Sequence, residues 1–345
     1  MAFRAIRCRP MQPKDVRLCA KVIASHPILA LRYGDAIRHL APSWLRLLGS
    51  EAFICDVFED HQPSGPVVLG AGMSVFVTDD FMRALKAPPS FWIGRELAIR
   101  VARGDSPLLS DKELRTANSS DGLNVAVWQT GVSPQHLIGG EVGGSIMTAF
   151  VESHRGFRLK EIVTQAECVD HIEALRNSGG LFWNSRGYGE IPAGAPEKIL
   201  AEPHVVGMSR DLASNSVGAW IALMFIYQPP RFGFSPSEER LILSAQGWGT
   251  DEELARKLGL SLATVKKTWR GIYERVHSCA PDLAFGSTPT GESPPERGKE
   301  KKRRLLAYLR EHPEELRPVL RRLLQQRVLS TRSASPVQSK ANPGS

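Results

Sequence analysis

The 345-residue sequence is long enough for two domains and a terminal segment. Its hydrophobic fraction of 42% is ordinary for a globular protein and excludes a largely disordered chain. The net charge of +8 is unevenly distributed: residues 234–345 hold 20 Lys and Arg against 13 Asp and Glu, whereas residues 1–233 are nearly neutral. A basic last third predicts either an anionic partner for that segment or a solvated, charged tail.

The five cysteines are widely separated, and no pair has the spacing of a zinc knuckle or a redox motif. This pattern predicts free thiols in a reducing cytoplasm, with no metal site. The longest apolar run, 217–227, is too short to span a bilayer, and no secretory signal pattern follows Met1. We therefore expect a cytoplasmic protein without membrane contact.

The first 180 residues alternate strand and helix patterns, which predicts an α+β domain built on a mixed sheet. The predicted strands are 3–9, 53–58, 66–78, 123–128 and 157–165, and the predicted helices are 12–23, 34–48, 91–103 and 145–154.

Residues 181–231 then predict a strand-rich extension, with strands at 181–183, 204–209 and 217–227. The last of these runs is apolar on both faces, which favours burial against a second copy of the chain. We expect a homodimer whose contacts come from this extension, or from leucines of residues 305–324.

Residues 232–285 predict an all-α domain of three capped helices. Ser235, Thr250 and Ser261 can each cap a helix N-terminus, and the first two have Glu238 and Glu253 as capping-box partners. Apolar residues recur on one side of the third helix, 262–278, from Val265 through Trp269 to Val276, while its other faces are basic. A helix, a Gly turn and a second helix with a basic outer face suit recognition of the DNA major groove.

These residues resemble the C-terminal DNA-binding domain of LuxR/FixJ-type regulators. The residues that match its pattern are Glu238, Gly247, Glu253-Leu254-Ala255, Leu258, Ser261, Thr264-Val265-Lys266, Ile272-Tyr273 and Arg275-Val276. The resemblance implies a helix-turn-helix that reads double-stranded DNA with helix 262–278. The DNA-binding residues that we expect are Thr250, Ser261, Thr264, Lys266, Lys267 and Arg270.

Residues 286–298 predict a flexible linker, 299–328 a basic helical pair and 329–345 a disordered tail. Four basic residues at the start of the pair could grip the DNA backbone: Lys301, Lys302, Arg303 and Arg304. The alternative is that the pair simply docks on its own chain.

The order of elements in residues 1–180 resembles the GNAT acyltransferase fold. Three stretches carry the resemblance: IRCRPMQPKDVRLCAKVI at 6–23, VVLGAGMSVFV at 67–77 as the central strand, and AFVESHRGFRLKEI at 149–162. In that fold a loop after the central strand, Gln or Arg followed by spaced glycines, holds the pyrophosphate of acyl-CoA at a helix N-terminus. Here Arg83 has no glycine closely after it and Gly94 stands alone, so we expect a scaffold or sensor without a cofactor. A PAS- or GAF-like sensor is the alternative.

Two further features of the sequence could have chemical roles. Gly139–Gly144 opens a helix and could cradle an anion, although such turns are usually only loops. Glu152 and His154 could form an acid–base pair, although on a short helix near a turn they are more often surface residues.

The expected function is therefore a sequence-specific DNA-binding transcriptional regulator that is not an enzyme, acting as a homodimer and responding to an unidentified small-molecule effector. The alternative is a divergent GNAT-type acyltransferase that carries a regulatory DNA-binding module.

Overall fold

The computed structural model describes residues 6–62, 64–87, 91–132, 140–168, 199–215, 219–247, 249–281 and 298–319. The chain divides into two compact units, Met1–Tyr227 (unit 1) and Gln228–Ser345 (unit 2). Across the described ranges, no helix combines the length and apolar character needed to cross a membrane.

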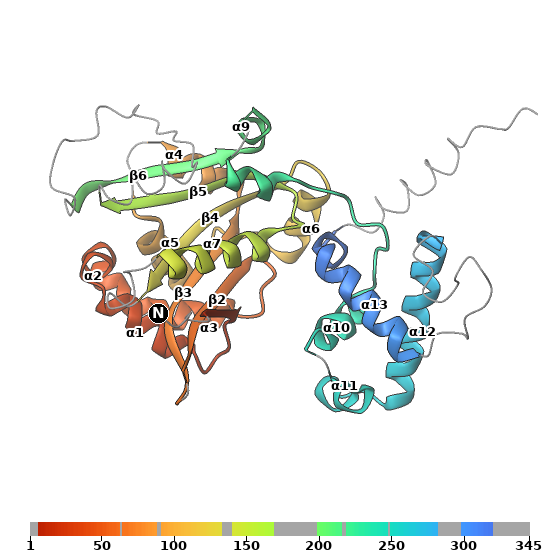
Figure 1. Ribbon diagram of the computed structural model, residues 1–345. Coiled ribbons are helices and arrows are strands. Elements are labelled where there is room, and N and C mark those ends of the chain that lie inside the picture. Colours follow the sequence, from red (N-terminus) through yellow and green to blue (C-terminus); the bar gives the residue numbers. More distant parts are fainter. Residues whose placement is uncertain are drawn as a thin grey trace, which may run out of the picture. The chain divides into compact units, whose positions relative to one another are not determined.

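Unit 1 is built on a six-stranded sheet whose strands lie in chain order (Figure 1). Neighbouring strands are antiparallel except β4 and β5, which are parallel and therefore need a crossover, supplied by α7 (Gly140–His154). The strands are β1 (Ile6–Pro10), β2 (Phe53–Gln62), β3 (Gly65–Val77), β4 (Leu123–Val132), β5 (Leu159–Cys168) and β6 (Ile199–Ser209). The expected α+β domain with a mixed sheet is confirmed.

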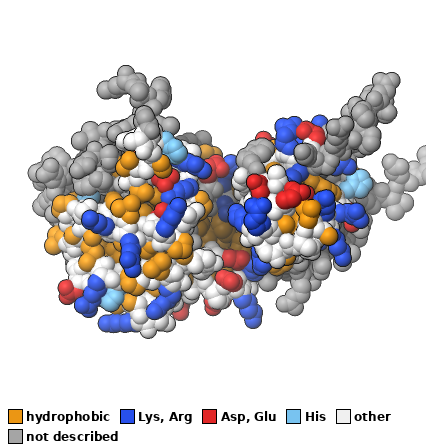
Figure 2. Space-filling view, turned by 90° about the horizontal axis from the view of Figure 1, so that it is seen from below, with side chains coloured by type: hydrophobic (Ala, Val, Ile, Leu, Met, Phe, Trp, Pro, Cys, Tyr) orange, Lys and Arg blue, Asp and Glu red, His pale blue; other side chains and the backbone are white. Residues whose placement is uncertain are grey.

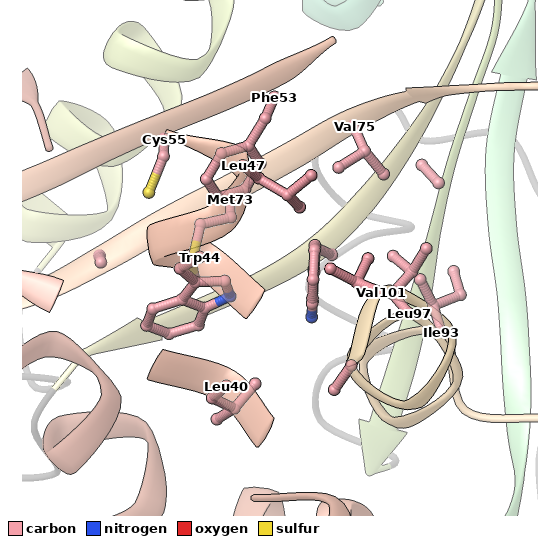
Figure 3. Close-up of a cluster of buried hydrophobic side chains, with 14 of the residues drawn as sticks. Leu40, Trp44, Leu47, Phe53, Cys55, Met73, Val75, Ile93, Leu97 and Val101 are labelled. Atoms are coloured by element: carbon pink, nitrogen blue, oxygen red, sulfur yellow. The ribbon is translucent and has the colours of Figure 1, made fainter. Parts of the chain in front are cut away.

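One face of this sheet is covered by the helical elements that come before residue 104 in the chain. Side chains alternate along a strand, so Phe53, Cys55, Met73 and Val75 all point to this face, where they pack with Trp44 and other buried apolar side chains (Figure 3). The covering elements are α1 (Val16–Ser25), α2 (Pro27–Tyr33), η1 (Gly34–His39), α3 (Leu40–Leu47), α4 (Asp79–Lys86) and α5 (Ile93–Arg103).

The opposite face is covered by α6 (Asp111–Ser119), α7, α9 (Arg210–Asn215) and η3 (Trp220–Phe225). Phe76, Leu114, Ile162 and Met224 are buried together there. Unit 1 is thus a three-layer sandwich with helices on both faces of the sheet.

The prediction of a strand-rich extension at 181–231 is wrong in two respects. β6 pairs with β5, so residues 199–209 belong to the main sheet. Residues 220–225 form the 3-10 helix η3, whose Met224 and Phe225 are buried against unit 1 itself. An apolar run without a period does not distinguish a strand from a buried helical turn. Among the described residues of the run, only these two are buried within the chain, whereas Leu223 and Ile226 are exposed, so the expected homodimer contact stays a prediction. Strand 181–183 lies outside the described residues.

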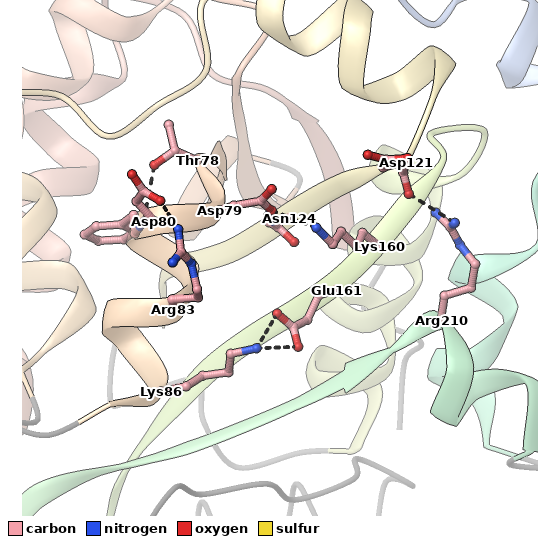
Figure 4. Close-up of polar contacts among 11 residues, drawn as sticks. Thr78, Asp79, Asp80, Arg83, Lys86, Asp121, Asn124, Lys160, Glu161 and Arg210 are labelled. Atoms are coloured by element: carbon pink, nitrogen blue, oxygen red, sulfur yellow. Dashed lines mark hydrogen bonds and ion pairs between the residues drawn. The ribbon is translucent and has the colours of Figure 1, made fainter.

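A polar network holds β4 and β5 together at their amino ends (Figure 4). Asp79 accepts hydrogen bonds from Asn124 at 2.6 Å and from the Lys160 ammonium at 2.8 Å, and these bonds lower the pKa of the Asp79 carboxyl. Nearby, Lys86 pairs with Glu161 at 2.8 Å. The network therefore stabilises the amino-terminal part of the β4–β5 pair, where the two strands are hydrogen-bonded to one another.

Unit 2 is helical in its described residues. Ser235 and Thr250 form the expected capping boxes, and the Ser261 hydroxyl accepts from the Thr264 N–H. Trp269 is buried among the apolar side chains that join the helices, as the sequence predicted. The helices are α10 (Pro236–Ala245), α11 (Asp251–Leu258), α12 (Leu262–Cys279) and α13 (Gly298–Glu311), followed by the 3-10 turn η5 (Pro313–Leu316).

The second half of the predicted basic helical pair is not a long helix where the structure describes it, because Pro313 opens only a 3-10 turn. Glu315 in that turn is buried, and its carboxylate accepts the backbone N–H groups of Arg231 and Phe232 at 2.9–3.0 Å. Linker residues 286–297, residues 320–328 of the pair and the tail 329–345 lie outside the described residues.

Candidate functional site

The parallel strands β4 and β5 separate part-way along their length. Their register pairs Leu123 with Leu159 and ends at Ala126 with Val163, although β4 continues to Val132 and β5 to Cys168. Beyond Ala126, β4 is paired with β3 but has no ladder partner on β5. The sheet therefore opens into a wedge-shaped gap that starts at this point.

A bulge in β4 marks the narrow end of the gap. Ser74 of β3 is opposite Val127, whereas Met73 is opposite Gln129, so Trp128 is the additional residue on β4. A bulge twists the strand and redirects its side chains, and bulges are frequent beside active sites.

A cavity of about 340 Å³ occupies the gap. Its walls include Tyr33, Trp92 and Gly94 from one covering layer, and Phe150 and His154 from the other. Paired strands leave no passage between them, so a cavity with walls in both layers must cross the sheet where β4 and β5 are separated. Two molecules could thus approach one point from opposite faces.

On the side of α2 and α5 the wall is mainly aromatic. The Arg32 guanidinium lies 4.0 Å from the centre of the Trp92 ring, and the Tyr33 hydroxyl is 3.4 Å from Gln129 Oε1. A Cβ atom on Gly94 would lie 2.7 Å from the Tyr33 ring and 3.3 Å from the Trp128 carbonyl oxygen, so only glycine permits α5 to approach this closely. Gln165 bonds the Ile93 N–H and the Phe91 carbonyl, which ties β5 to the start of α5.

On the side of α7 the wall contains a buried Ser–His pair. His154 Nε2 lies 2.6 Å from Ser74 Oγ, and Nδ1 lies 2.7 Å from the Phe150 carbonyl oxygen. A carbonyl only accepts, so Nδ1 carries the proton and Nε2 accepts from the serine hydroxyl. The Ser153 hydroxyl also lies 3.2 Å from His154 Nδ1, and the aromatic rings of Phe76 and Phe150 pack against the imidazole.

The sequence expectation for His154 was wrong, because this residue is only 1% exposed. The Glu152 carboxylate pairs with Arg155 at 3.0 Å on the surface. A single sequence carries no signal that would join His154 to a serine 80 residues earlier.

Residues 140–144 of the Gly-rich stretch form the start of helix α7, which follows the separating strand β4 in the chain. Residues 133–139 are outside the described residues, but Gly143 and Gly144 belong to α7 and have open space around the position of a Cβ atom. From the sequence, the pyrophosphate-binding loop is expected after the central strand β3, where Arg83 and Gly94 lie. The structure shows instead that β4 is the strand that separates from its parallel neighbour and leads into a crossover helix. Within the described residues, no cluster of His, Cys, Asp or Glu could hold a metal ion.

The residues expected to contact DNA lie in unit 2. Thr250 and Ser261 use their hydroxyls to cap their own helices, and Lys266, Lys267 and Arg270 are exposed on α12. On the face of unit 2 that Figure 2 shows as the right-hand lobe, Asp and Glu side chains lie beside Lys and Arg.

Three of the four basic residues expected to contact the DNA backbone form ion pairs within unit 2. Lys302 pairs with Asp251 at 3.1 Å and lies over the Trp269 ring at 5.1 Å, and Arg303 and Arg304 both pair with Glu300. Lys302 therefore joins α13 to α11 and α12, which agrees with the docked alternative.

No family model and no curated protein matches the chain. Solved structures do resemble it. An arylalkylamine N-acetyltransferase-like protein from mosquito is 13% identical, with a TM-score of 0.34, over 59% of this chain and 97% of its own. A polyamine N-acetyltransferase from Drosophila melanogaster is 15% identical, with a TM-score of 0.33, over the same shares. A spermidine N-acetyltransferase chimera from Vibrio cholerae is 12% identical, with a TM-score of 0.31, over 59% and 95%.

These comparisons contradict the expectation of a LuxR-type DNA-binding transcriptional regulator that is not an enzyme. The solved structures named here are acetyltransferases, and no comparison supports a LuxR-type helix-turn-helix. At such low identities and TM-scores the likeness does not assign an activity or a substrate, so any functional argument must come from the cavity itself. The single parallel strand pair and the crossover helix of unit 1 agree with the resemblance to the GNAT acyltransferase fold that the sequence indicates.

Proposed function

We propose that unit 1 is an acyltransferase domain that moves an acyl group from a thioester donor to a small acceptor inside the cavity between β4 and β5. The observation that carries the proposal is that this cavity crosses the sheet at the gap and has walls in both covering layers. Two reactants that enter from opposite faces would meet at a fixed point, and such positioning alone can account for a large part of a catalysed rate.

The donor would occupy the side of α7. The backbone of β4 beyond Ala126 has no ladder partner on β5, so it can pair with the amide groups of an extended donor arm as another strand would. The start of α7 lies next along the chain, and a helix N-terminus favours an anionic group such as a pyrophosphate. These features fit acyl-CoA.

One buried atom, on the side of α2 and α5, also favours a ligand in the cavity. The indole N–H of Trp128, at the bulge and in the cavity wall, has no hydrogen-bond partner among the described residues. A buried donor without an acceptor is unfavourable, and a ligand carbonyl is one group that could supply the acceptor. The Gly-rich stretch departs from the family pattern, because no Gln or Arg precedes Gly143 at the expected spacing.

The acceptor would occupy the side of α2 and α5. Tyr33, Trp92 and Trp128 make that wall aromatic, and Gln129 is its amide group nearest to the bulge. Such a wall selects a small, largely apolar molecule that carries an amine or hydroxyl group.

Calorimetric titration of the full chain with acetyl-CoA tests the proposal. Thr164 of β5 lines the gap, so T164W should fill it and abolish binding, whereas T116W, on the exposed side of α6, should bind like wild type. Melting curves of both variants establish that they are folded. The proposal fails if wild type does not bind acetyl-CoA, or if folded T164W binds it equally well.

A further inference from the structure

The buried Ser74–His154 pair has the arrangement of an activated nucleophile. A serine hydroxyl becomes nucleophilic when a base lies within hydrogen-bond reach and a third group orients that base. Here the base lies 2.6 Å from the hydroxyl, and the Phe150 carbonyl fixes its tautomer and ring plane at 2.7 Å.

The pair also lies where a reaction would have to take place. Ser74 is opposite Val127, the first residue of β4 beyond its last partner on β5, and next to the Trp128 bulge. Both Ser74 and His154 line the cavity, and both are at most 2% exposed. The hydroxyl is therefore shielded from bulk water but borders the space proposed for the acyl donor.

A purely structural role explains this placement less well. Helix α7 is already anchored to the sheet by apolar contacts of Val142, Ile146, Phe150 and Val151. A polar pair adds little to such an anchor, because removing its two groups from water offsets most of the hydrogen bond that it forms.

We propose that Ser74 is a covalent acyl acceptor and that His154 is its base, so that acyl transfer passes through an acyl-serine. This inference rests on the proposed function. In the first step Ser74 Oγ attacks the thioester carbonyl, His154 Nε2 takes the hydroxyl proton, the C–S bond breaks, and that proton passes to the thiolate that leaves as a free thiol.

In the second step an amine or alcohol attacks the ester carbonyl of the acyl-serine. His154 takes a proton from the attacking group and returns it to Ser74 Oγ as the ester C–O bond breaks. The acceptor leaves acylated, and both side chains return to their starting protonation states.

The test treats the full chain with acetyl-CoA in the absence of an acceptor, quenches with acid and locates acetyl groups by peptide mass spectrometry. An alkyl fluorophosphonate, which labels activated serines irreversibly, provides a second trap that does not depend on the lifetime of an acetyl-serine. We expect both labels on Ser74 in wild type. S74A should remove them and H154Q should reduce them at least 100-fold, while S120A, which changes an exposed serine outside the cavity, should retain them.

Binding of CoA by S74A separates this inference from the proposed function. If S74A binds CoA like wild type but cannot be labelled and does not transfer acetyl groups, both are supported. If wild type transfers acetyl groups without label on Ser74, or S74A transfers them at the wild-type rate, the acyl-serine is refuted and the acyltransferase remains. If wild type neither binds CoA nor transfers acetyl groups, the proposed function itself fails.

Discussion

Replacing Gly94 with alanine tests whether the wall of the cavity is as closely packed as the structure indicates. The added Cβ would lie 2.7 Å from Cζ of Tyr33 and closer still to its hydroxyl oxygen, whereas ordinary contact begins at 3.4 Å. The Tyr33 side chain would have to move by at least about 0.7 Å, the difference between the Cζ distance and ordinary contact, although it is only 1% exposed. Overpacking of this kind costs about 1–3 kcal/mol, from which the better helix propensity of alanine recovers at most about 1 kcal/mol.

We therefore expect G94A to lower the free energy of unfolding of unit 1 by about 1–2 kcal/mol. Hydrogen exchange of β4 peptides in the full chain measures this free energy without a contribution from unit 2. The matched control is G144A on α7, where a Cβ meets nothing within 4 Å and stability should be unchanged or slightly higher.

A second substitution checks the cause. Y33F removes the hydroxyl oxygen that the Cβ of G94A would approach most closely, so the double variant should be less destabilised than the sum of the two single variants. An unchanged stability of G94A, or strict additivity in the double variant, would refute this account of the cavity wall.

The remaining predictions concern three residues of unit 2. Glu315→Gln leaves one backbone N–H facing an amide N–H₂, and should lower the free energy of unfolding in urea by about 1–3 kcal/mol. The control is E252Q, which changes an exposed carboxyl and should leave the stability unchanged. Burial raises the pKa of the Glu315 carboxyl, so its contribution to the free energy of unfolding is present at low pH and is lost as pH rises through the folded-state pKa. E315Q, which cannot titrate at this position, should flatten that part of the stability–pH profile. A profile as steep as that of wild type would contradict the prediction. K302A removes the ion pair with Asp251 and the contact with the Trp269 ring, and should lower the midpoint of urea unfolding by an amount equivalent to about 0.5–1 kcal/mol. An unchanged midpoint would mean that Lys302 does not stabilise unit 2. W269A should cost about 3–5 kcal/mol by the same assay, and a small change would mean that the indole is not part of the core.

Much of the secondary structure was predictable because its signals are local. The strands at 53–58, 66–78 and 157–165 follow from β-branched and aromatic runs, and the unit 2 helices follow from capping residues such as Ser235 and Thr250. The run at 217–227 failed for the opposite reason, since continuous apolar character has no period that separates a strand from the 3-10 helix that forms.

The candidate site was mostly beyond prediction because it depends on the arrangement of strands. The gap exists only because β4 and β5 separate after Ala126, and nothing in either strand's composition marks that point. The pairing of Ser74 with His154 joins β3 to the end of α7 across 80 residues. The functional prediction failed because a match over about 45 residues of unit 2 was extended to the whole chain, whereas the cavity lies in unit 1.

The most direct test of an acyl-donor site in the β4–β5 gap is hydrogen exchange of the full chain with and without acetyl-CoA. The proposed site predicts slower exchange in β4 beyond Ala126, in β5 from Thr164 and at the start of α7, with no change in unit 2. Unchanged exchange in the β4 and α7 peptides at saturating acetyl-CoA, or protection confined to Gln228–Ser345, would contradict it.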